Sequence, residues 1–136
     1  MLMLMAECAA KRTDCRRAQK GVGAVIASGG RSVSSGYAGP VSGAPSCSDA
    51  GCNLAEPCTR TVHAELNAIL FAARAGVATL GCTMYSTTSP CIRCAEAIIQ
   101  AGISRLVYRE AYRDVGGLDL LRTHGVTVDH LDIYNG

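Results

Sequence analysis

The chain has 136 residues, a length that suits one domain with a core covered by helices. Its residues are 49% apolar but include no Trp and one Phe, which favours close packing of helices on a sheet. The formal charge of +2 gives no electrostatic footprint for a long nucleic acid, although a mononucleotide needs only one or two cations.

The first five residues are apolar, but Glu7, Lys11 and Arg12 follow at once and no basic leader precedes them. This pattern favours a helix face over a signal peptide, and no run reaches membrane-spanning length. We therefore expect a cytoplasmic protein, in a bacterium or in a virus-infected cell. Reducing conditions disfavour disulfides, so the eight cysteines indicate metal binding.

Helices and strands alternate along most of the sequence. Periodicity and turn residues predict, in chain order, a helix over 1–15, strands over 22–27 and 31–37, a helix over 61–75, a strand over 83–87, a helix over 90–101, a strand over 104–108, a helix over 117–124 and a strand over 126–131. The alternation after the hairpin predicts a parallel part of the sheet with helices on both faces.

Two of the predicted helices carry apolar stripes. The stripes contain Leu2, Met5 and Ala9 in the first helix, and Val62, Leu66, Ile69, Leu70 and Ala73 in the second. Between the hairpin and the second helix, residues 38–60 are rich in Gly, Ser, Pro and Cys and show no period. A loop of this length inside a compact domain is usually functional, and its cysteines indicate a metal that orders it.

One histidine and two cysteines have the spacing of a metal site. His63 is expected in the first turn of one helix, and Cys91 and Cys94 share a face of another, with Ser89 predicted as its N-cap. Three protein ligands leave a fourth zinc position for water. Glu65 can move a proton of that water without being a ligand. The alternative is a structural zinc site beside an unrelated histidine, which gives Glu65 no duty.

The pattern H-x-E with P-C-x-x-C is the signature of zinc nucleobase deaminases. The segments His63–Ile69 and Ser89–Ala95 resemble the cytidine deaminase superfamily and, within it, the deoxycytidylate (dCMP) deaminases. The match also includes Gly23–Ile26, Gly36–Tyr37, Arg60–His63, Ala101–Ile103 and Leu106–Tyr108. The resemblance implies a three-layer α/β/α sandwich around a five-stranded mixed sheet, with residues 1–136 as one deaminase domain.

The resemblance also implies an activity and an assembly. Water activated by zinc would attack C4 of the cytosine of dCMP, and Glu65 would pass protons to N3 and to the departing ammonia. The product, dUMP, would feed thymidylate synthesis. The family implies a homo-hexamer, often controlled by dCTP and dTTP with Mg²⁺, and no feature of this sequence decides whether that control is present.

A second set of cysteines lies upstream. Several dCMP deaminases carry a structural zinc built from these regions, and the resemblance implies such a site here, held by Cys15, Cys47, Cys52 and Cys58. For the fourth ligand, Cys52 and Cys58 compete with Cys8. The alternative is a set of free buried cysteines. If they bind no metal, Cys8 and Cys82 are expected in the core.

Substrate recognition is where the sequence departs from the family. In the family, the residue after Gly-Tyr is usually an Asn that contacts the sugar, but here Ala38 follows Tyr37. Either Asn53 or a backbone group replaces it, or the substrate differs, for example by a modification at C5 of the base. Backbone groups near Ser89 and Cys91 are candidate partners for the exocyclic amine and the water.

A 5′-phosphate requires cations. Arg17, Lys20 and Arg113 are candidates, and each is equally consistent with an ordinary surface charge. Tyr112 follows a strand at the carboxyl edge of the sheet, where it could stack on the pyrimidine or touch the phosphate. The alternative functions are deamination of a tRNA adenosine, of guanine or of a riboflavin precursor, and a zinc-stabilised nucleotide-binding module without catalysis. The non-basic C-terminus disfavours tRNA.

Overall fold

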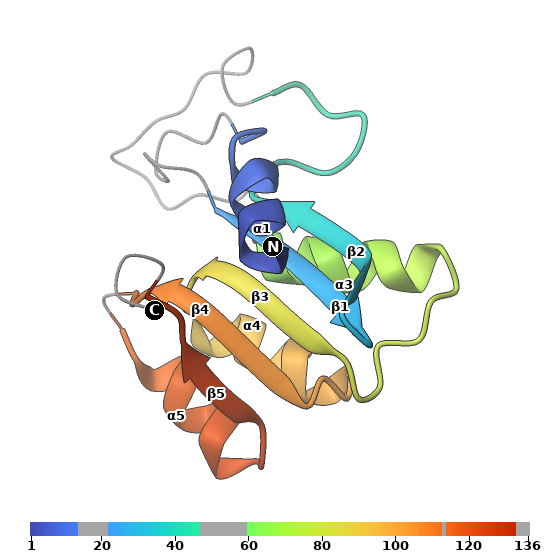
Figure 1. Cartoon of the computed structure of the whole chain (residues 1–136). Helices are drawn as coiled ribbons and strands as arrows, with labels where there is room; N and C mark the ends of the chain where they lie inside the picture. The colour runs from blue at the N-terminus through green and yellow to red at the C-terminus, as the bar shows by residue number, and fades with distance from the viewer. Residues whose placement is uncertain (14–21, 47–59, 113, 133–136) are drawn as a thin grey trace.

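The computed structural model describes residues 1–13, 22–46, 60–112 and 114–132 (Figure 1). The elements in chain order are α1 (Leu2–Ala10), β1 (Gly23–Ser28), β2 (Arg31–Tyr37), α3 (Ala64–Arg74), β3 (Thr83–Thr88), α4 (Ile92–Gln100), β4 (Arg105–Glu110), α5 (Gly116–Thr123) and β5 (Thr127–His130). None of the helices among these residues is long and apolar enough to cross a membrane.

The strands form one mixed sheet in the order β2-β1-β3-β4-β5. β1 is antiparallel to both β2 and β3, whereas β3, β4 and β5 are parallel to one another. The predicted hairpin between β1 and β2 is confirmed. Its turn residues Gly29 and Gly30 have φ angles of 57° and 78°, which glycine adopts at low cost in a two-residue hairpin turn.

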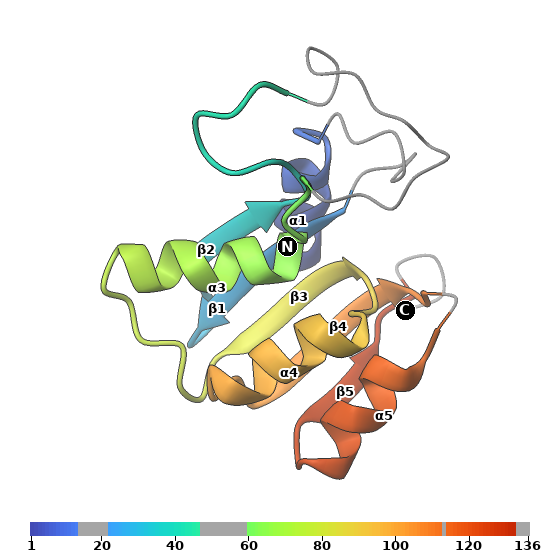
Figure 2. The same ribbon diagram turned by 180° about the vertical axis from the view of Figure 1, so that it is seen from behind.

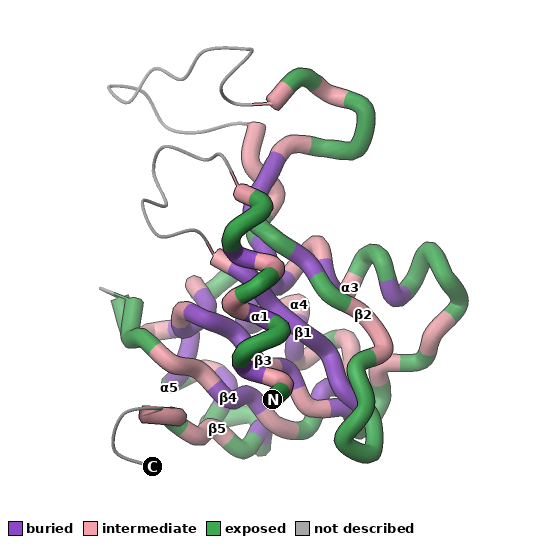
Figure 3. The backbone as a smooth tube through the Cα atoms, turned by 45° about the horizontal axis from the view of Figure 1, so that its top comes forward, coloured by how far each residue is buried: buried purple, intermediate pink, exposed green. Residues whose placement is uncertain are grey.

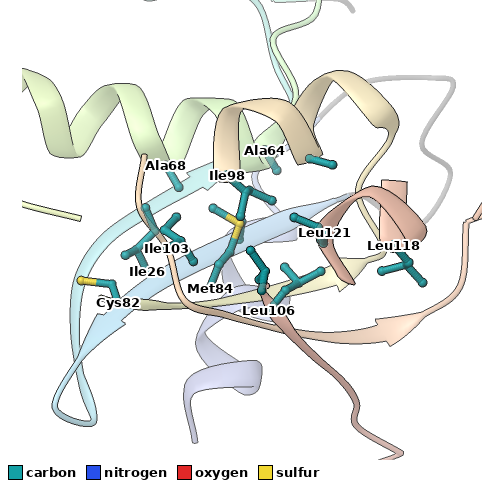
Figure 4. Packing of buried hydrophobic residues seen from close by; sticks show 13 residues of the cluster. Ile26, Ala64, Ala68, Cys82, Met84, Ile98, Ile103, Leu106, Leu118 and Leu121 are labelled. Carbon is teal, nitrogen blue, oxygen red and sulfur yellow. The ribbon is translucent and has the colours of Figure 1, made fainter. Parts of the chain in front are cut away.

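Helices cover both faces of the sheet, as the resemblance implied. α1 lies on one face (Figure 1), and α3, α4 and α5 lie on the other (Figure 2). The larger core lies beneath the three helices, where Met84, Ile98, Leu106 and Leu121 are all fully buried (Figure 4). The smaller core joins α1 to Val25 and Val107. Buried residues run along the central strands β1 and β3 (Figure 3).

The prediction for the first helix was wrong about its end and its buried face. α1 ends at Ala10, and its buried residues are Met3, Ala6 and Ala10. Cys8, which was also expected in the core, is exposed on this helix, whereas Cys82 is buried as expected. The physical reason lies on β1, because a Cβ atom at Gly23 would come within 2.1 Å of the Ala6 carbonyl oxygen. The backbones therefore approach closely, and alanines fit this contact better than the larger side chains that marked the predicted stripe.

The prediction for α3 was also wrong about the buried face of the helix. The buried residues are Ala64, Glu65, Ala68 and Ala72, while Leu70 is exposed. A Cβ atom at Gly36 of β2 would be 2.5 Å from the Ala64 carbonyl oxygen, so this helix also approaches the sheet too closely for large side chains. The predicted end was right, since Gly76 follows the helix with a φ of 71°.

The start of α4 also differs from its prediction. Cys91 is the N-cap residue, with φ −70° and ψ 171°, so neither Ser89 nor Pro90 belongs to the helix. At the other end, the predicted stop at Gly102 is confirmed, with Ala101 as the C-cap and a φ of 77° at Gly102. The C-terminal strands and helices lie within two residues of their predicted positions.

Candidate metal centre and active site

His63, Cys91 and Cys94 come together at the starts of two helices. His63 is the N-cap residue of α3, Cys91 is the N-cap residue of α4, and Cys94 lies one turn into α4. The Nδ1 atom of His63 lies 3.5 Å from the Cys91 Sγ and 3.3 Å from the Cys94 Sγ. The three ligand atoms lie within 4.8 Å of one another, as the spacing of the motifs predicted, although His63 precedes its helix instead of lying in the first turn.

These distances fit a zinc ion. Zn–N and Zn–S bonds in a tetrahedral site imply a separation of about 3.6 Å between the nitrogen and each sulfur. The observed separations of 3.5 and 3.3 Å are close to that value. One imidazole and two thiolates are also ligands that zinc prefers, and three protein ligands leave the fourth tetrahedral position for water or substrate.

The electrostatics of the cluster favour a bound cation over free thiolates. Burial raises the pKa of the Cys94 thiol far above its ordinary value, and the negative charges of Glu65 and Cys91 raise it further. Two thiolates and a carboxylate in such proximity repel one another when no cation is bound. A dication bound among them removes that penalty, because it stabilises the thiolates it ligates.

Glu65 lies behind this cluster, in the first turn of α3, with only 4% of its surface exposed. Its side chain contacts the Cys94 thiol, and its Oε1 lies 3.1 Å from the Oγ of Ser86 on β3. A buried carboxylate in this position has the chemistry to carry a proton to and from a reacting group.

Sequence reasoning missed Ser86. The available signal was a serine in the middle of a strand predicted to be buried, between Tyr85 and Thr87. Thr87 is a second buried polar residue of this strand, and its Oγ1 accepts a hydrogen bond from the Gly23 amide. Both side chains have partners that are distant in the sequence, which no local pattern reveals.

Ser89 has a different role from the predicted N-cap. Its Oγ accepts a hydrogen bond from the Tyr112 amide at 2.6 Å, and its own amide donates to the Glu110 carbonyl at 2.9 Å. The segment that follows β4 is thereby tied to the loop that carries Cys91. Tyr112 is half exposed at this edge, a position consistent with contact to a substrate.

The remaining predicted substrate residues are not brought into this cluster by the described structure. Ala38 is buried, and its amide donates to the Val22 carbonyl. Close to it, Asn67 of α3 donates to the Tyr37 carbonyl at 2.8 Å and so fixes the end of β2. The other predicted residues lie outside the described part of the chain, and these are Cys15, Arg17, Lys20, Cys47, Cys52, Asn53, Cys58 and Arg113.

Comparison with protein families decides the class of this site. Residues 1–110 match the model of the cytidine and deoxycytidylate deaminase zinc-binding region. The chain belongs to this family. The matched region contains His63, Glu65, Cys91 and Cys94, so the three-ligand cluster and the buried glutamate both lie within the zinc-binding region of the deaminase.

Individual relatives agree with this assignment. The chain is 40% identical to ComE operon protein 2 of Bacillus subtilis, over 91% of its own length and 66% of that protein. It is 38% identical to the deoxycytidylate deaminase of Enterobacteria phage T4, over 79% of its own length and 77% of the phage enzyme. Among solved structures, the dCMP deaminase of cyanophage S-TIM5 in complex with dCMP and dUMP superimposes with a TM-score of 0.86 at 30% identity, covering 95% of this chain and 93% of that one.

Proposed function

We propose that this deaminase converts dCMP to dUMP by hydrolysis and so supplies dUMP for thymidylate synthesis. The observation that carries the proposal is the convergence of His63, Cys91 and Cys94 on one point, with the buried carboxylate of Glu65 beside them. The likeness over almost the whole chain to a phage enzyme solved with dCMP and dUMP supports this nucleotide as the substrate.

In this proposal, a zinc ion held by His63, Cys91 and Cys94 would act as a Lewis acid and would make water nucleophilic near neutral pH. The protein's own contribution is to place a proton carrier and exclude bulk solvent. Glu65 takes one proton from the attacking water and donates it to N3 of the cytosine. It then takes the second proton of the added oxygen and donates it to the amino group, which leaves C4 as ammonia. Its burial keeps the carboxylate near the reacting atoms and away from competing water.

A panel of substrates tests the assignment. Purified zinc-loaded protein should release ammonia from dCMP at a kcat/KM well above that for cytidine, deoxycytidine, dCTP or an adenosine-bearing tRNA hairpin. A strong preference for a nucleoside over its monophosphate would overturn the substrate while leaving the deaminase chemistry intact. Ammonia release from none of the compounds would instead support a nucleotide-binding module without catalysis.

A second candidate substrate, dCMP modified at C5, follows from Ala38. Its methyl side chain is buried and cannot hydrogen-bond to a sugar in the manner expected of the family's Asn. Comparing 5-methyl-dCMP and 5-hydroxymethyl-dCMP with dCMP tests this candidate. A higher kcat/KM for either modified nucleotide would make that nucleotide the preferred substrate.

Arg17, Lys20 and Arg113 are proposed to bind the phosphate of the nucleotide. Tyr112 and Ser89 are proposed to contact its cytosine base. Tyr112 has the position for such contact, because its amide is held by Ser89 next to the metal ligands. Replacing each cation by Ala in turn should raise KM for dCMP more than KM for deoxycytidine. Equal effects on both substrates would remove that residue from the phosphate site.

A second zinc, held by Cys15, Cys47, Cys52 and Cys58, is proposed to order the long loop. Metal analysis of the purified protein should then find about two zinc ions per chain, because each site has its own set of protein ligands. A value near one, unchanged by Cys47→Ser, would contradict this site.

We also propose that the protein is a homo-hexamer, as the family resemblance implied, and that it is cytoplasmic, as expected from the sequence. Analytical ultracentrifugation should give the mass of six chains. Repeating the dCMP assay with dCTP, dTTP and Mg²⁺ tests for allosteric control, which would appear as a change in the concentration of dCMP that gives half the maximal rate.

A further inference from the structure

Ser86 is a fully buried serine on β3, the middle strand of the sheet. Its partners across the sheet are Ala24 on β1 and Tyr108 on β4. Two residues earlier on the same face, Met84 belongs to the core beneath α3 and α4. A hydroxyl group on such a face lowers stability unless it has hydrogen-bond partners, so the partners of Ser86 are informative.

The two partners of the hydroxyl group differ in kind. The Oγ atom lies 2.7 Å from the backbone carbonyl oxygen of Thr88 and 3.1 Å from the Oε1 atom of Glu65. A serine hydroxyl has one hydrogen to donate and lone pairs with which to accept. Both the Glu65 carboxylate and the Thr88 carbonyl are acceptors within reach of its hydrogen, so the two contacts together fix where the hydroxyl lies.

We propose that Ser86 is a positioning residue, whose hydroxyl holds one oxygen of Glu65 so that the side chain keeps one orientation throughout turnover. This inference rests on the proposed function, in which Glu65 carries protons to the substrate. Ser86 can orient that side chain because both residues are buried and the Ser86 hydroxyl is itself held against the Thr88 carbonyl. A strand in the middle of the sheet provides a rigid base for such a contact.

The first test separates positioning from folding. Ser86→Ala should bind zinc fully, keep KM for dCMP within about twofold, and lower kcat by about 10- to 100-fold, the range typical of groups that orient catalytic residues. The matched control is Ser34→Ala, because the Ser34 hydroxyl also ties a strand to α3, but through the Ala68 carbonyl at 2.7 Å. This control should leave kcat unchanged. A wild-type kcat in Ser86→Ala, or a fall in kcat that only matches lost zinc, would overturn the proposal.

The second test needs no turnover. The urea midpoints of zinc-loaded wild type, Ser86→Ala, Glu65→Ala and the double variant form a thermodynamic cycle. If the two side chains interact, the double variant should lose less stability than the sum of the single variants, and additive losses would contradict the contact. This cycle measures unfolding and does not depend on activity. If the wild type failed to deaminate dCMP, the proposed function would be refuted, whereas the Ser86–Glu65 contact would still be tested by the cycle.

Discussion

Gly117 should be essential for zinc binding even though it is not a ligand. It is buried in the first turn of α5 and packs directly on the segment that carries Cys91. A Cβ atom at this position would lie 2.2 Å from the Pro90 carbonyl oxygen and 3.0 Å from the backbone carbonyl carbon and oxygen of Cys91. The nearest of these contacts is about 1 Å too short, so either α5 or the loop must move by about that amount.

The expected magnitude of Gly117→Ala follows from this shift. Helix propensity alone would stabilise the protein by up to about 1 kcal/mol, whereas overpacking costs about 1–3 kcal/mol, so we expect a net loss of stability. A ligand displaced by even part of 1 Å exceeds the roughly 0.2 Å tolerance of a zinc site, and a misplacement of about 1 Å costs on the order of 100-fold in activity.

Competition with a chromophoric chelator measures the zinc affinity of Gly117→Ala, and dCMP turnover measures its activity. The matched control is Gly116→Ala, because its new Cβ atom would meet only side-chain atoms as its nearest neighbours, Asp114 Oδ1 at 3.1 Å and Ile92 Cδ1 at 3.2 Å, which can move aside. The control should resemble the wild type. Zinc affinity and kcat/KM within twofold of wild type in Gly117→Ala would refute the packing argument.

Three further predictions concern pH, the core and the substrate edge. The folded, metal-free protein holds the Cys94 proton more tightly than the unfolded chain, so its free energy of unfolding should fall as pH rises above the ordinary thiol pKa of 9.0. Urea titrations at pH 8 and pH 10, with a chelator present, measure this change. A free energy of unfolding that rises over this range would contradict the direction of the pKa shift. Leu106→Ala should cost about 2–5 kcal/mol and the exposed Leu70→Ala less than about 1 kcal/mol, and equal losses of Tm would refute the observed burial of the two residues. Ser89→Ala frees the Tyr112 amide and should raise KM for dCMP by about 3- to 10-fold at full zinc content, whereas an unchanged KM would separate Tyr112 from the substrate.

The sequence predicted the elements of this fold better than their buried faces. Strong turn signals such as Gly29-Gly30 and Gly102 act locally, so the hairpin and the end of α4 could be predicted. The buried faces of α1 and α3 depend instead on how closely each helix approaches the sheet. That distance is set by Gly23 and Gly36, which are far away in the sequence, and it favours alanine over leucine.

The same distinction holds for the site. His63, Cys91 and Cys94 could be predicted because metal chemistry restricts both the residue types and their spacing. Ser86 could not, since a buried serine gains its role only from its contact with Glu65 on another element. Ser89 was misassigned because serine before proline is also a common helix start, and its actual partner, Tyr112, is 23 residues away.

The proposed deamination by a zinc-bound site with Glu65 as proton carrier is tested most directly by dCMP turnover and zinc content in the wild type and in Glu65→Gln. The zinc-loaded wild type should form one dUMP and one ammonia from each dCMP. Glu65→Gln should retain the zinc held by His63, Cys91 and Cys94. Its kcat for dCMP should fall by about 100- to 10,000-fold, the usual contribution of a general acid–base group. Near-wild-type turnover by Glu65→Gln, or no ammonia from dCMP with the zinc-loaded wild type, would contradict the account.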